Sequence, residues 1–195
     1  MNFAIVGATG NVGRKTLDVL TKSKIKIDKL FLVASKKSVG KIIIFKKKKI
    51  KVEALENYNF AKAKITIFAA GSLIAKKWAP IAAKKTIVID NSKYFRMDKN
   101  VPLVVPEVNE RAIKIYKKKN IIANPNCSTA QLVLALKPLH DKFRIKRVVV
   151  STYQAVSGAG KAPMDELFSQ TRNFLKGNKI KPKNFTKQIA FNLIP

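Results

Sequence analysis

The sequence predicts an α/β domain followed by the start of an α+β domain. Short apolar runs alternate with segments whose apolar residues recur at helical spacing, and this alternation continues to about Leu139. Such alternation is typical of a sheet with helices packed on it. Beyond Leu139 it ends, so we place the domain boundary between residues 141 and 142. The first domain then covers residues 1–141, and residues 142–195 form an incomplete second domain.

Composition is consistent with a cytoplasmic protein. The chain has 195 residues, of which 47% are hydrophobic, enough for a sizeable core. Its single cysteine, Cys127, excludes an intramolecular disulfide and fits a reducing compartment. The N-terminal residues enter a strand pattern with no basic region before it, so we expect no signal peptide. No apolar run reaches the roughly 18 residues of a membrane span, so we expect no membrane association.

The net charge of +29, from 40 Lys+Arg against 11 Asp+Glu, allows two interpretations. A strongly basic surface can bind nucleic acid, or lysine can simply fill solvent-facing positions. The lysines are dispersed along the chain, and aromatic residues are not interleaved with them as on a base-stacking surface. We therefore favour the solvated surface and do not expect specific nucleic-acid binding. The same field would attract an anionic substrate or a phosphorylated cofactor.

The first unit of the chain reads as strand, glycine turn and helix. The apolar run Phe3 to Val6 is followed by glycines at Gly7, Gly10 and Gly13, and then by a helical pattern. The glycines permit a tight turn, let a phosphate approach the backbone, and let the helix pack on the sheet. This spacing is a variant of the dinucleotide fingerprint, although glycine turns without ligands are common. It predicts a Rossmann-type dinucleotide-binding domain.

The loop after the second strand points to the type of dinucleotide. The strand is expected over residues 30–34, and the loop reads Ser35-Lys36-Lys37-Ser38. NAD-binding folds usually place a carboxylate there to hold the ribose 2′-hydroxyl. Two cations and two hydroxyls suit a 2′-phosphate instead, and therefore NADP. The alternative is an ordinary solvated loop.

The remaining elements of the first domain continue the alternation. An edge hairpin is expected over residues 41–53, with its turn in the lysine run 46–49. A buried strand over residues 65–70 ends at Gly71, where the missing side chain would let a cofactor come close. Further elements are expected in the order helix 73–85, strand 86–90, helix 108–118 and strand 120–123.

The irregular segment 91–109 contains Arg96. Long loops at strand ends of open α/β sheets carry ligand contacts. A guanidinium can bind a carboxylate or phosphate bidentately, so Arg96 is a candidate anion clamp. An ordinary surface charge is the alternative.

Cys127 is the candidate nucleophile. A strand leads into Asn124-Pro125-Asn126-Cys127, and a helical pattern follows from Ala130. The thiol should therefore lie in the first helical turn, where unpaired N–H groups and the helix dipole favour a thiolate. Asn126 or Ser128 can cap the helix. The alternative is a small buried hydrophobic residue.

The second domain begins with a predicted strand over residues 143–153. A glycine-rich turn over residues 154–160 and a helix over residues 164–174 follow. The end of the chain, residues 177–195, is basic and finishes on an apolar run.

Five stretches, in the same order along the chain, closely resemble the aspartate-β-semialdehyde dehydrogenase family: residues 6–13, 35–41, 95–109, 124–129 and 152–160. The resemblance implies an NADP-binding domain that carries the catalytic cysteine, followed by a substrate and dimerisation domain, in a homodimer. The implied reaction reduces aspartyl phosphate to aspartate semialdehyde and releases phosphate, on the route to lysine, threonine and methionine.

The resemblance also implies roles for single residues. Cys127 would form the acyl-thioester and Gln154 would orient the substrate, while Arg96 and Asn126 would hold phosphate. The family usually has arginine where Lys37 stands. Cofactor contacts are implied in three groups: Thr9, Gly10, Asn11 and Val12 at the pyrophosphate, Lys37 and Ser38 at the 2′-phosphate, and Ser157 and Gly158 near the nicotinamide.

Two other functions remain open: a related acyl-phosphate reductase of the N-acetyl-glutamyl-phosphate type, and a non-catalytic basic nucleotide- or nucleic-acid-binding module. The family has a further stretch beyond Pro195 that supplies a histidine acid/base, so we expect impaired turnover from these residues alone. His140 is the only histidine and stands thirteen positions after Cys127. Along a helix that separation is roughly 20 Å, so we assign it no catalytic role. We expect no metal site.

Overall fold

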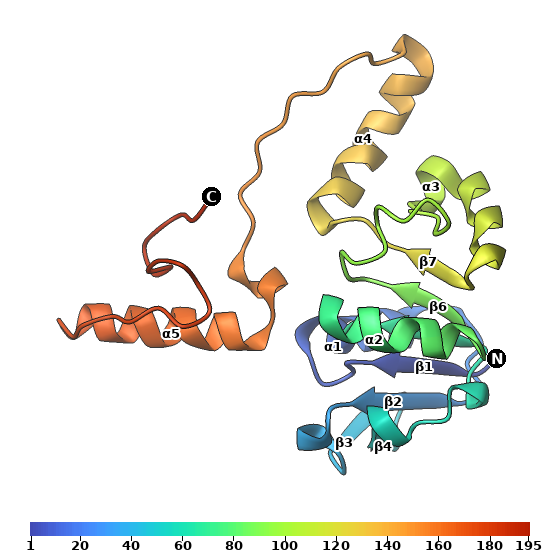
Figure 1. Ribbon diagram of the computed structural model, residues 1–195, viewed down its shortest axis with the longest axis horizontal. Coiled ribbons are helices and arrows are strands. Elements are labelled where there is room, and N and C mark those ends of the chain that lie inside the picture. Colours follow the sequence, from blue (N-terminus) through green and yellow to red (C-terminus); the bar gives the residue numbers. More distant parts are fainter. The chain divides into compact units, whose positions relative to one another are not determined.

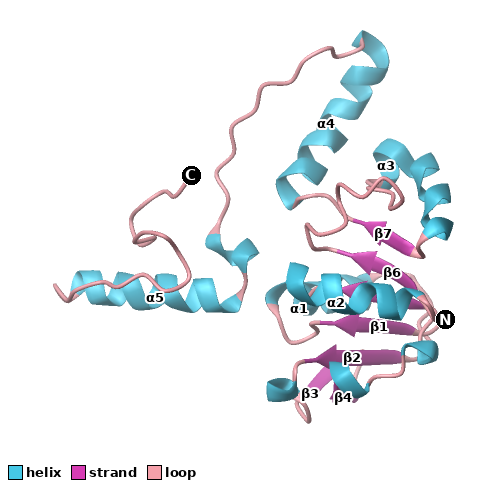
Figure 2. Ribbon diagram, viewed as in Figure 1, coloured by secondary structure: helices cyan, strands magenta, loops and turns pink.

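The computed structural model describes residues 1–195, which divide into two compact units, Met1–Val150 and Ser151–Pro195. The first unit is built on one seven-stranded sheet with the strand order β3-β4-β2-β1-β5-β6-β7 (Figures 1 and 2). All neighbouring strands are parallel except β3 and β4. The strands are β1 (Phe3–Val6), β2 (Leu30–Ala34), β3 (Ile42–Phe45), β4 (Lys48–Ala54), β5 (Ile65–Phe68), β6 (Ile87–Asp90) and β7 (Ile121–Ala123).

The chain winds outward from β1 in both directions. It moves first to β2 on one side and later crosses back to β5 on the other. The strand order therefore reverses between β1 and β5, which is the point where doubly wound sheets bind ligands at the carboxyl ends of their strands. The predicted α/β fold is confirmed.

Within the first unit, α1 and α2 pack on opposite faces of the sheet. The α-helices are α1 (Asn11–Lys22), α2 (Ser72–Ala83), α3 (Pro106–Asn109), α4 (Cys127–Phe143) and α5 (Lys161–Leu175). The 3₁₀ turns are η1 (Lys36–Ser38), η2 (Leu55–Asn57), η3 (Phe60–Lys62), η4 (Glu110–Lys118) and η5 (Val156–Ala159). No helix of the protein is both long enough and apolar enough to cross a membrane.

The core has two layers because alternate strand residues face opposite sides of the sheet. On one side, Leu17 and Leu20 of α1 pack with Ile5 and Leu32. On the other, a row of alanines on α2 packs with Val6 and the neighbouring strands. Fully burying one such aliphatic side chain contributes about 1.5–3 kcal/mol. These two layers fix the strand ends from which the candidate site is built.

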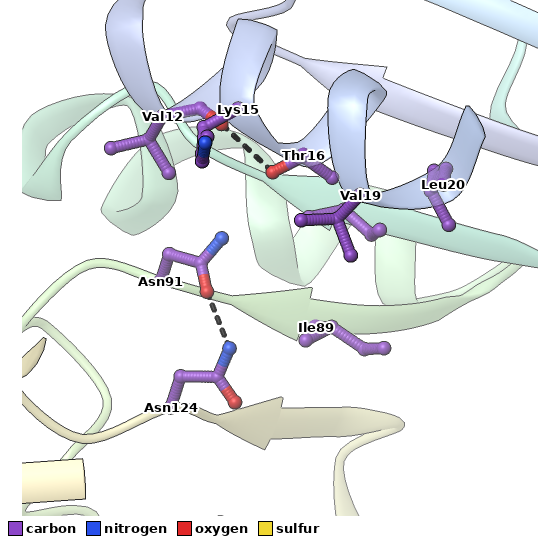
Figure 3. A pocket seen from close by; sticks show the side chains of 9 residues that line it. Val12, Lys15, Thr16, Val19, Leu20, Ile89, Asn91 and Asn124 are labelled. Atoms are coloured by element: carbon purple, nitrogen blue, oxygen red, sulfur yellow. Dashed lines mark hydrogen bonds between the residues drawn. The ribbon is translucent and has the colours of Figure 1, made fainter. Parts of the chain in front are cut away.

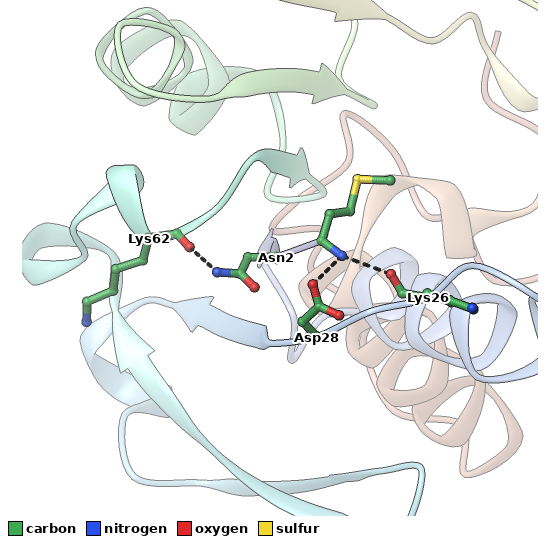
Figure 4. A network of polar contacts seen from close by, with 5 residues as sticks. Asn2, Lys26, Asp28 and Lys62 are labelled. Atoms are coloured by element: carbon green, nitrogen blue, oxygen red, sulfur yellow. Dashed lines mark hydrogen bonds and ion pairs between the residues drawn. The ribbon is translucent and has the colours of Figure 1, made fainter.

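Hydrogen bonds tie the start of the chain to the amino ends of the strands (Figure 4). The Met1 ammonium forms an ion pair with Asp28 at 2.6 Å and donates to the Lys26 carbonyl oxygen at 3.1 Å. The Asn2 side chain donates to the Lys62 carbonyl oxygen at 3.1 Å. These contacts fix the amino end of β1, whose other end carries the glycine turn.

The predicted edge hairpin is confirmed, with a tighter turn than the lysine run suggested. Only Lys46 and Lys47 form the turn, and Lys48 and Lys49 already pair with Phe45 and Ile44. Both turn residues have positive φ, 45° and 68°. Positive φ at both central residues is the mark of a type I′ turn, the favoured two-residue hairpin connection.

Two predicted elements differ from the structure. The expected helix over residues 108–118 is a short α3 followed by the 3₁₀ segment η4. The break falls at Asn109, whose side chain accepts from the Val105 N–H and donates to the Leu103 carbonyl oxygen, each at 2.9 Å. These bonds back to the preceding loop hold the Asn109 backbone at φ −143°, outside the helical region.

The predicted strand over residues 143–153 is wrong. Residues 144–155 form no regular secondary structure, and Val149 and Tyr153 are 79% and 82% exposed. A strand exists only where a neighbour completes its hydrogen bonds, and no strand of residues 1–195 pairs with this segment. Residues 143–153 have the alternating pattern of a strand, but no neighbouring strand pairs with them.

The second unit contains η5, α5 and a terminal segment folded against α5. The expected helix over residues 164–174 is confirmed and begins earlier, at Lys161. The buried Glu166 carboxylate accepts from the backbone N–H groups of Lys183 and Asn184 at 2.7 and 2.6 Å. Gln170 accepts from the N–H groups of residues 189 and 190. The predicted boundary at 141/142 stays a prediction.

Candidate functional site

The glycine turn joins β1 to α1 and is tightly packed. Gly7 has φ +85°, and an added Cβ there would lie 2.6 Å from the Ala69 carbonyl oxygen. An added Cβ at Gly13 would lie 2.2 Å from the Gly7 carbonyl oxygen. A side chain at Gly7 would displace the turn from the end of β5, and a side chain at Gly13 would displace α1 from the turn. The packing keeps the first N–H groups of α1 at the carboxyl edge of the sheet, where an anion can bind them.

The loop after β2 contacts this glycine turn. Thr9 Oγ donates to Ser38 Oγ at 3.2 Å, although 29 residues separate them. Ser38 is buried, whereas Lys36 and Lys37 are exposed beside it in η1. Two predicted groups of cofactor residues, one in the glycine turn and one after the second strand, are therefore brought together.

Gly71 lies at the end of β5, next to the glycine turn in the sheet. Its φ is +82°, and nothing lies within 4 Å of an added Cβ. Gly71 is also the N-cap of α2. The position is open, as expected for a strand end that a ligand approaches.

Cys127 is the first residue of α4, as the sequence predicted. Asn126 is the N-cap, and its Oδ1 accepts from the Ser128 N–H at 3.0 Å. The Cys127 Sγ lies 3.9 Å from the same oxygen, and the thiol is exposed. Exposure argues against the buried hydrophobic alternative, and the cap leaves the thiol at the positive end of a 17-residue helix.

Arg96 lies against the turn that carries Cys127. Its Nε donates to the Asn124 carbonyl oxygen at 2.8 Å, and its Nη2 donates to the Pro125 and Asn91 carbonyl oxygens at 3.2 and 3.3 Å. The guanidinium is half-buried, and the Nη1 group makes none of these contacts. Arg96, the predicted anion clamp, therefore lies close to the turn over residues 124–126 that precedes Cys127. Its hydrogen bonds also hold that turn in place.

Three residues at the end of β6 take part in this arrangement and were missed by sequence reasoning. The fully buried Asp90 carboxylate accepts from Ser92 N–H at 3.1 Å and from Ser92 Oγ at 2.7 Å. Burial raises the pKa of Asp90, and the Ser92 hydrogen bonds and the Arg96 charge oppose that rise. The Asn91 side chain accepts from the Asn124 side chain. The available signal was a polar Asp-Asn-Ser run directly after a strand.

A cavity of about 370 Å³ lies on the α1 face beside these groups (Figure 3). Its walls are mostly apolar, and the hydrogen-bonded Asn91 and Asn124 side chains form a polar end. One predicted cofactor residue, Val12, lines it. The lining residues are Val12, Lys15, Thr16, Val19, Leu20, Ile67, Ile89, Asn91 and Asn124.

The remaining predicted site residues belong to the second unit. Gln154 Nε2 donates to Thr152 Oγ at 3.5 Å. Ser157 and Gly158 lie in η5, the turn that precedes α5, and Gly160 N-caps that helix with φ 103°. In the first unit, the predicted site residues come from distant parts of the sequence and meet at one edge of the sheet.

The site and its fold match one family. The family model for the semialdehyde dehydrogenase NAD binding domain matches residues 2–116. The chain belongs to the semialdehyde dehydrogenase family. The model for the dimerisation domain of semialdehyde dehydrogenases matches residues 136–195. The resemblance inferred from five motifs is thus confirmed.

Curated relatives match the whole length of this semialdehyde dehydrogenase chain. Aspartate-semialdehyde dehydrogenase 2 of Vibrio cholerae is 50% identical over 195 residues, covering 100% of this chain and 58% of the relative. The aspartate-semialdehyde dehydrogenase of Aquifex aeolicus is 54% identical over 98% of this chain and 57% of its own length. The chain therefore spans a little under three fifths of the relatives that it matches.

Solved structures in the family agree with the fold. Aspartate semialdehyde dehydrogenase II of Vibrio cholerae, complexed with ASA, superposes with a TM-score of 0.92 at 49% identity, over 98% of this chain and 57% of that one. The Candida albicans aspartate semialdehyde dehydrogenase with NADP gives a TM-score of 0.62 at 31% identity, over 73% of this chain and 47% of that one.

Proposed function

We propose that this chain carries the cofactor-binding and thiol-bearing part of an NADP-dependent aspartate-semialdehyde dehydrogenase. The observation that carries the proposal is the place of the single cysteine. Cys127 is exposed at the capped start of α4, braced by Arg96, on the same sheet edge as the glycine turn. The aspartate-semialdehyde dehydrogenases that match at about half identity favour this substrate over an N-acetyl-glutamyl phosphate.

The residues at the sheet edge fit NADP. The N–H groups at the start of α1 can receive the pyrophosphate, with Thr9, Gly10, Asn11 and Val12 around it. The loop after β2 offers Ser35, Lys37 and Ser38, and no carboxylate, to the 2′-phosphate. Lysine supplies charge without the bidentate geometry of arginine. The further residues that we assign to the cofactor are Gly7, Gly13, Gly71, Ser157 and Gly158.

The thiol chemistry follows from this placement. The Cys127 thiolate attacks the carbonyl carbon of aspartyl phosphate, the carbon–oxygen bond to phosphate breaks, and a thioester remains. Arg96 and Asn126 hold the departing phosphate, and Gln154 orients the substrate. When bound, NADPH would supply the hydride that the thioester carbonyl carbon accepts. The carbon–sulfur bond then breaks, which returns the thiolate and releases aspartate semialdehyde.

The substrates and the assembly are part of the same proposal. The small-molecule partners are aspartyl phosphate, aspartate semialdehyde and phosphate. The match to a dimerisation domain over residues 136–195 supports a homodimer. We place the protein in the cytoplasm, with the reducing environment that a free thiol needs.

The reverse reaction tests the proposal. The chain is incubated with aspartate semialdehyde, NADP and phosphate, and NADPH absorbance and the mass of the Cys127 adduct are followed. An acyl-enzyme that Cys127→Ser abolishes, with cofactor binding unchanged, is the expected result. Acylation by N-acetylglutamate semialdehyde but not by aspartate semialdehyde would favour the related reductase. Absence of both NADP binding and acylation would contradict the proposal.

A further inference from the structure

The end of β6 holds the cysteine turn through Asn91, a residue to which the proposed reaction gives no role. Asn91 N–H donates to the Phe68 carbonyl oxygen at 3.0 Å, which fixes its backbone to β5. Its side-chain oxygen accepts from the Asn124 amide, 33 residues later in the chain (Figure 3). Its backbone carbonyl accepts from Arg96 Nη2 at 3.3 Å. Asn91 therefore links the rigid sheet to both Asn124 and Arg96.

The link that Asn91 holds is short. Only Asn124, Pro125 and Asn126 separate the end of β7 from Cys127. Asn124 N–H also donates to the Asp90 carbonyl oxygen at 2.9 Å, so backbone and side chain of Asn124 are both held by the end of β6. With its first residue fixed, the turn has little freedom to change where α4 begins.

We propose that Asn91 is a positioning residue for the Cys127 thiol. Through Asn124 it fixes the turn, and the turn sets how Asn126 caps α4 and where the thiol lies relative to the unpaired N–H groups of the first helical turn. Those groups and the helix dipole stabilise a thiolate only within about one turn of the helix end. The identity of the substrate that the thiolate attacks rests on the proposed function. The positioning of the thiol by Asn91 does not.

A role in stability alone makes a different prediction. If Asn91 only held β6 and β7 together, its loss would lower the melting temperature and leave the folded thiol unchanged. If it positions the thiol, its loss changes thiolate formation in molecules that are still folded. Cys127 is the only cysteine, so thiol alkylation reports on this position alone.

The experiment measures iodoacetamide alkylation of the 195-residue chain and of Asn91→Ala, with circular dichroism to confirm folding. The readout is the rate at about pH 7 divided by the rate at about pH 9.5, where an ordinary thiol is largely ionised. We expect the ratio to fall roughly two- to fivefold in the variant, the size of a helix-terminus effect on a charge. Neither substrate nor cofactor is needed, so failure of the dehydrogenase proposal would not affect this result.

Asn59→Ala is the matched control. Asn59 is an exposed asparagine whose Oδ1 accepts from Ala61 N–H at 3.0 Å in η3, away from the carboxyl strand ends. It should leave the ratio unchanged. Asn124→Ala removes the same contact from its other side and serves if Asn91→Ala does not fold. An unchanged ratio in either folded variant would overturn the proposal. The double variant gives a second test: if its change in the ratio equals the two single changes combined, the two side chains act independently and the proposal is wrong.

Discussion

Arg96 Nε donates to the Asn124 carbonyl oxygen at 2.8 Å and so joins the loop after β6 to the turn before the thiol. The contact spans 28 residues of sequence. A guanidinium uses several N–H groups in a fixed plane, so it can hold backbone carbonyls and still present one side to an anion. Arg96 therefore combines a structural contact with the proposed contact to phosphate.

The Arg96 proposal predicts how phosphate protects the thiol. Inorganic phosphate should slow alkylation of Cys127, and Arg96→Lys should weaken that protection roughly tenfold or more, since a hydrogen bond to a charged group contributes about 1.5–3 kcal/mol. The measurement is the phosphate concentration that halves the alkylation rate. Arg111→Lys, at an exposed arginine in η4, is the control and should match the parent chain. Equal protection in both variants would remove Arg96 from the phosphate site.

Lys37 should decide between the two nicotinamide cofactors. We expect NADP to bind more tightly than NAD, and Lys37→Ala to weaken NADP by about fivefold, the effect of one exposed charge pair of about 1 kcal/mol. NAD affinity should not change. Added salt should weaken NADP binding more than NAD binding, because the extra contact joins two charges.

Isothermal titration with each cofactor measures both affinities. The control is Lys22→Ala, at the end of α1 opposite the glycine turn. If Lys37→Ala binds both cofactors as the parent chain does, the assignment of the 2′-phosphate to this loop is wrong.

The parts of the site that could be predicted are those that local sequence determines. Gly7 and Gly13 were predictable because a turn between a strand and a helix requires them. Cys127 was predictable because the strand before it and the helical pattern after it fix the helix start. The family resemblance then gave these positions their roles.

The contacts that were missed depend on which strands are neighbours. Asn91 and Asn124 meet because β6 and β7 lie side by side and end at the same edge of the sheet. No local pattern marks that pairing. The wrong strand over residues 143–153 has the same origin, since its alternation indicated a strand and only a neighbouring strand could complete it.

Glycine in the hairpin turn at Lys46 and Lys47 should make the protein more stable. Both residues have positive φ, where a side chain costs about 1 kcal/mol relative to glycine. Lys47→Gly should therefore raise the free energy of unfolding by up to about 1 kcal/mol, offset in part by the greater freedom of glycine in the unfolded chain. Thermal and urea unfolding measure the change.

Lys99→Gly is the control for the hairpin, since Lys99 is an exposed turn residue without positive φ. There glycine should lower stability, because only the unfolded chain gains freedom. A loss of stability in Lys47→Gly of the same size as in Lys99→Gly would show that the left-handed turn carries no strain.

Glu166 makes the fold of the second unit depend on pH. Burial by itself would raise the pKa of Glu166, but hydrogen bonds from Lys183, Asn184 and Gln170 outweigh it and hold that pKa below its ordinary value. A lowered pKa in the folded chain means that the charged carboxylate stabilises the fold above the ordinary pKa of 4.5, and that this contribution disappears as the pH falls through the folded value. The terminal segment should therefore loosen from α5 in acid.

Hydrogen exchange of the Lys183 and Asn184 amides measures this loosening, because both donate to the Glu166 carboxylate. Glu166→Gln should speed their exchange well above pH 4.5. All four groups around the carboxylate are donors. A glutamine at position 166 accepts through its one oxygen only, so it cannot satisfy all four. Asp165→Asn is the matched control, because that neighbouring carboxylate is 58% exposed and pairs only with Lys161. Exchange that is equally slow in Glu166→Gln and Asp165→Asn would mean that apolar packing, including the Phe174–Phe191 ring contact at 4.9 Å, holds the segment without the carboxylate.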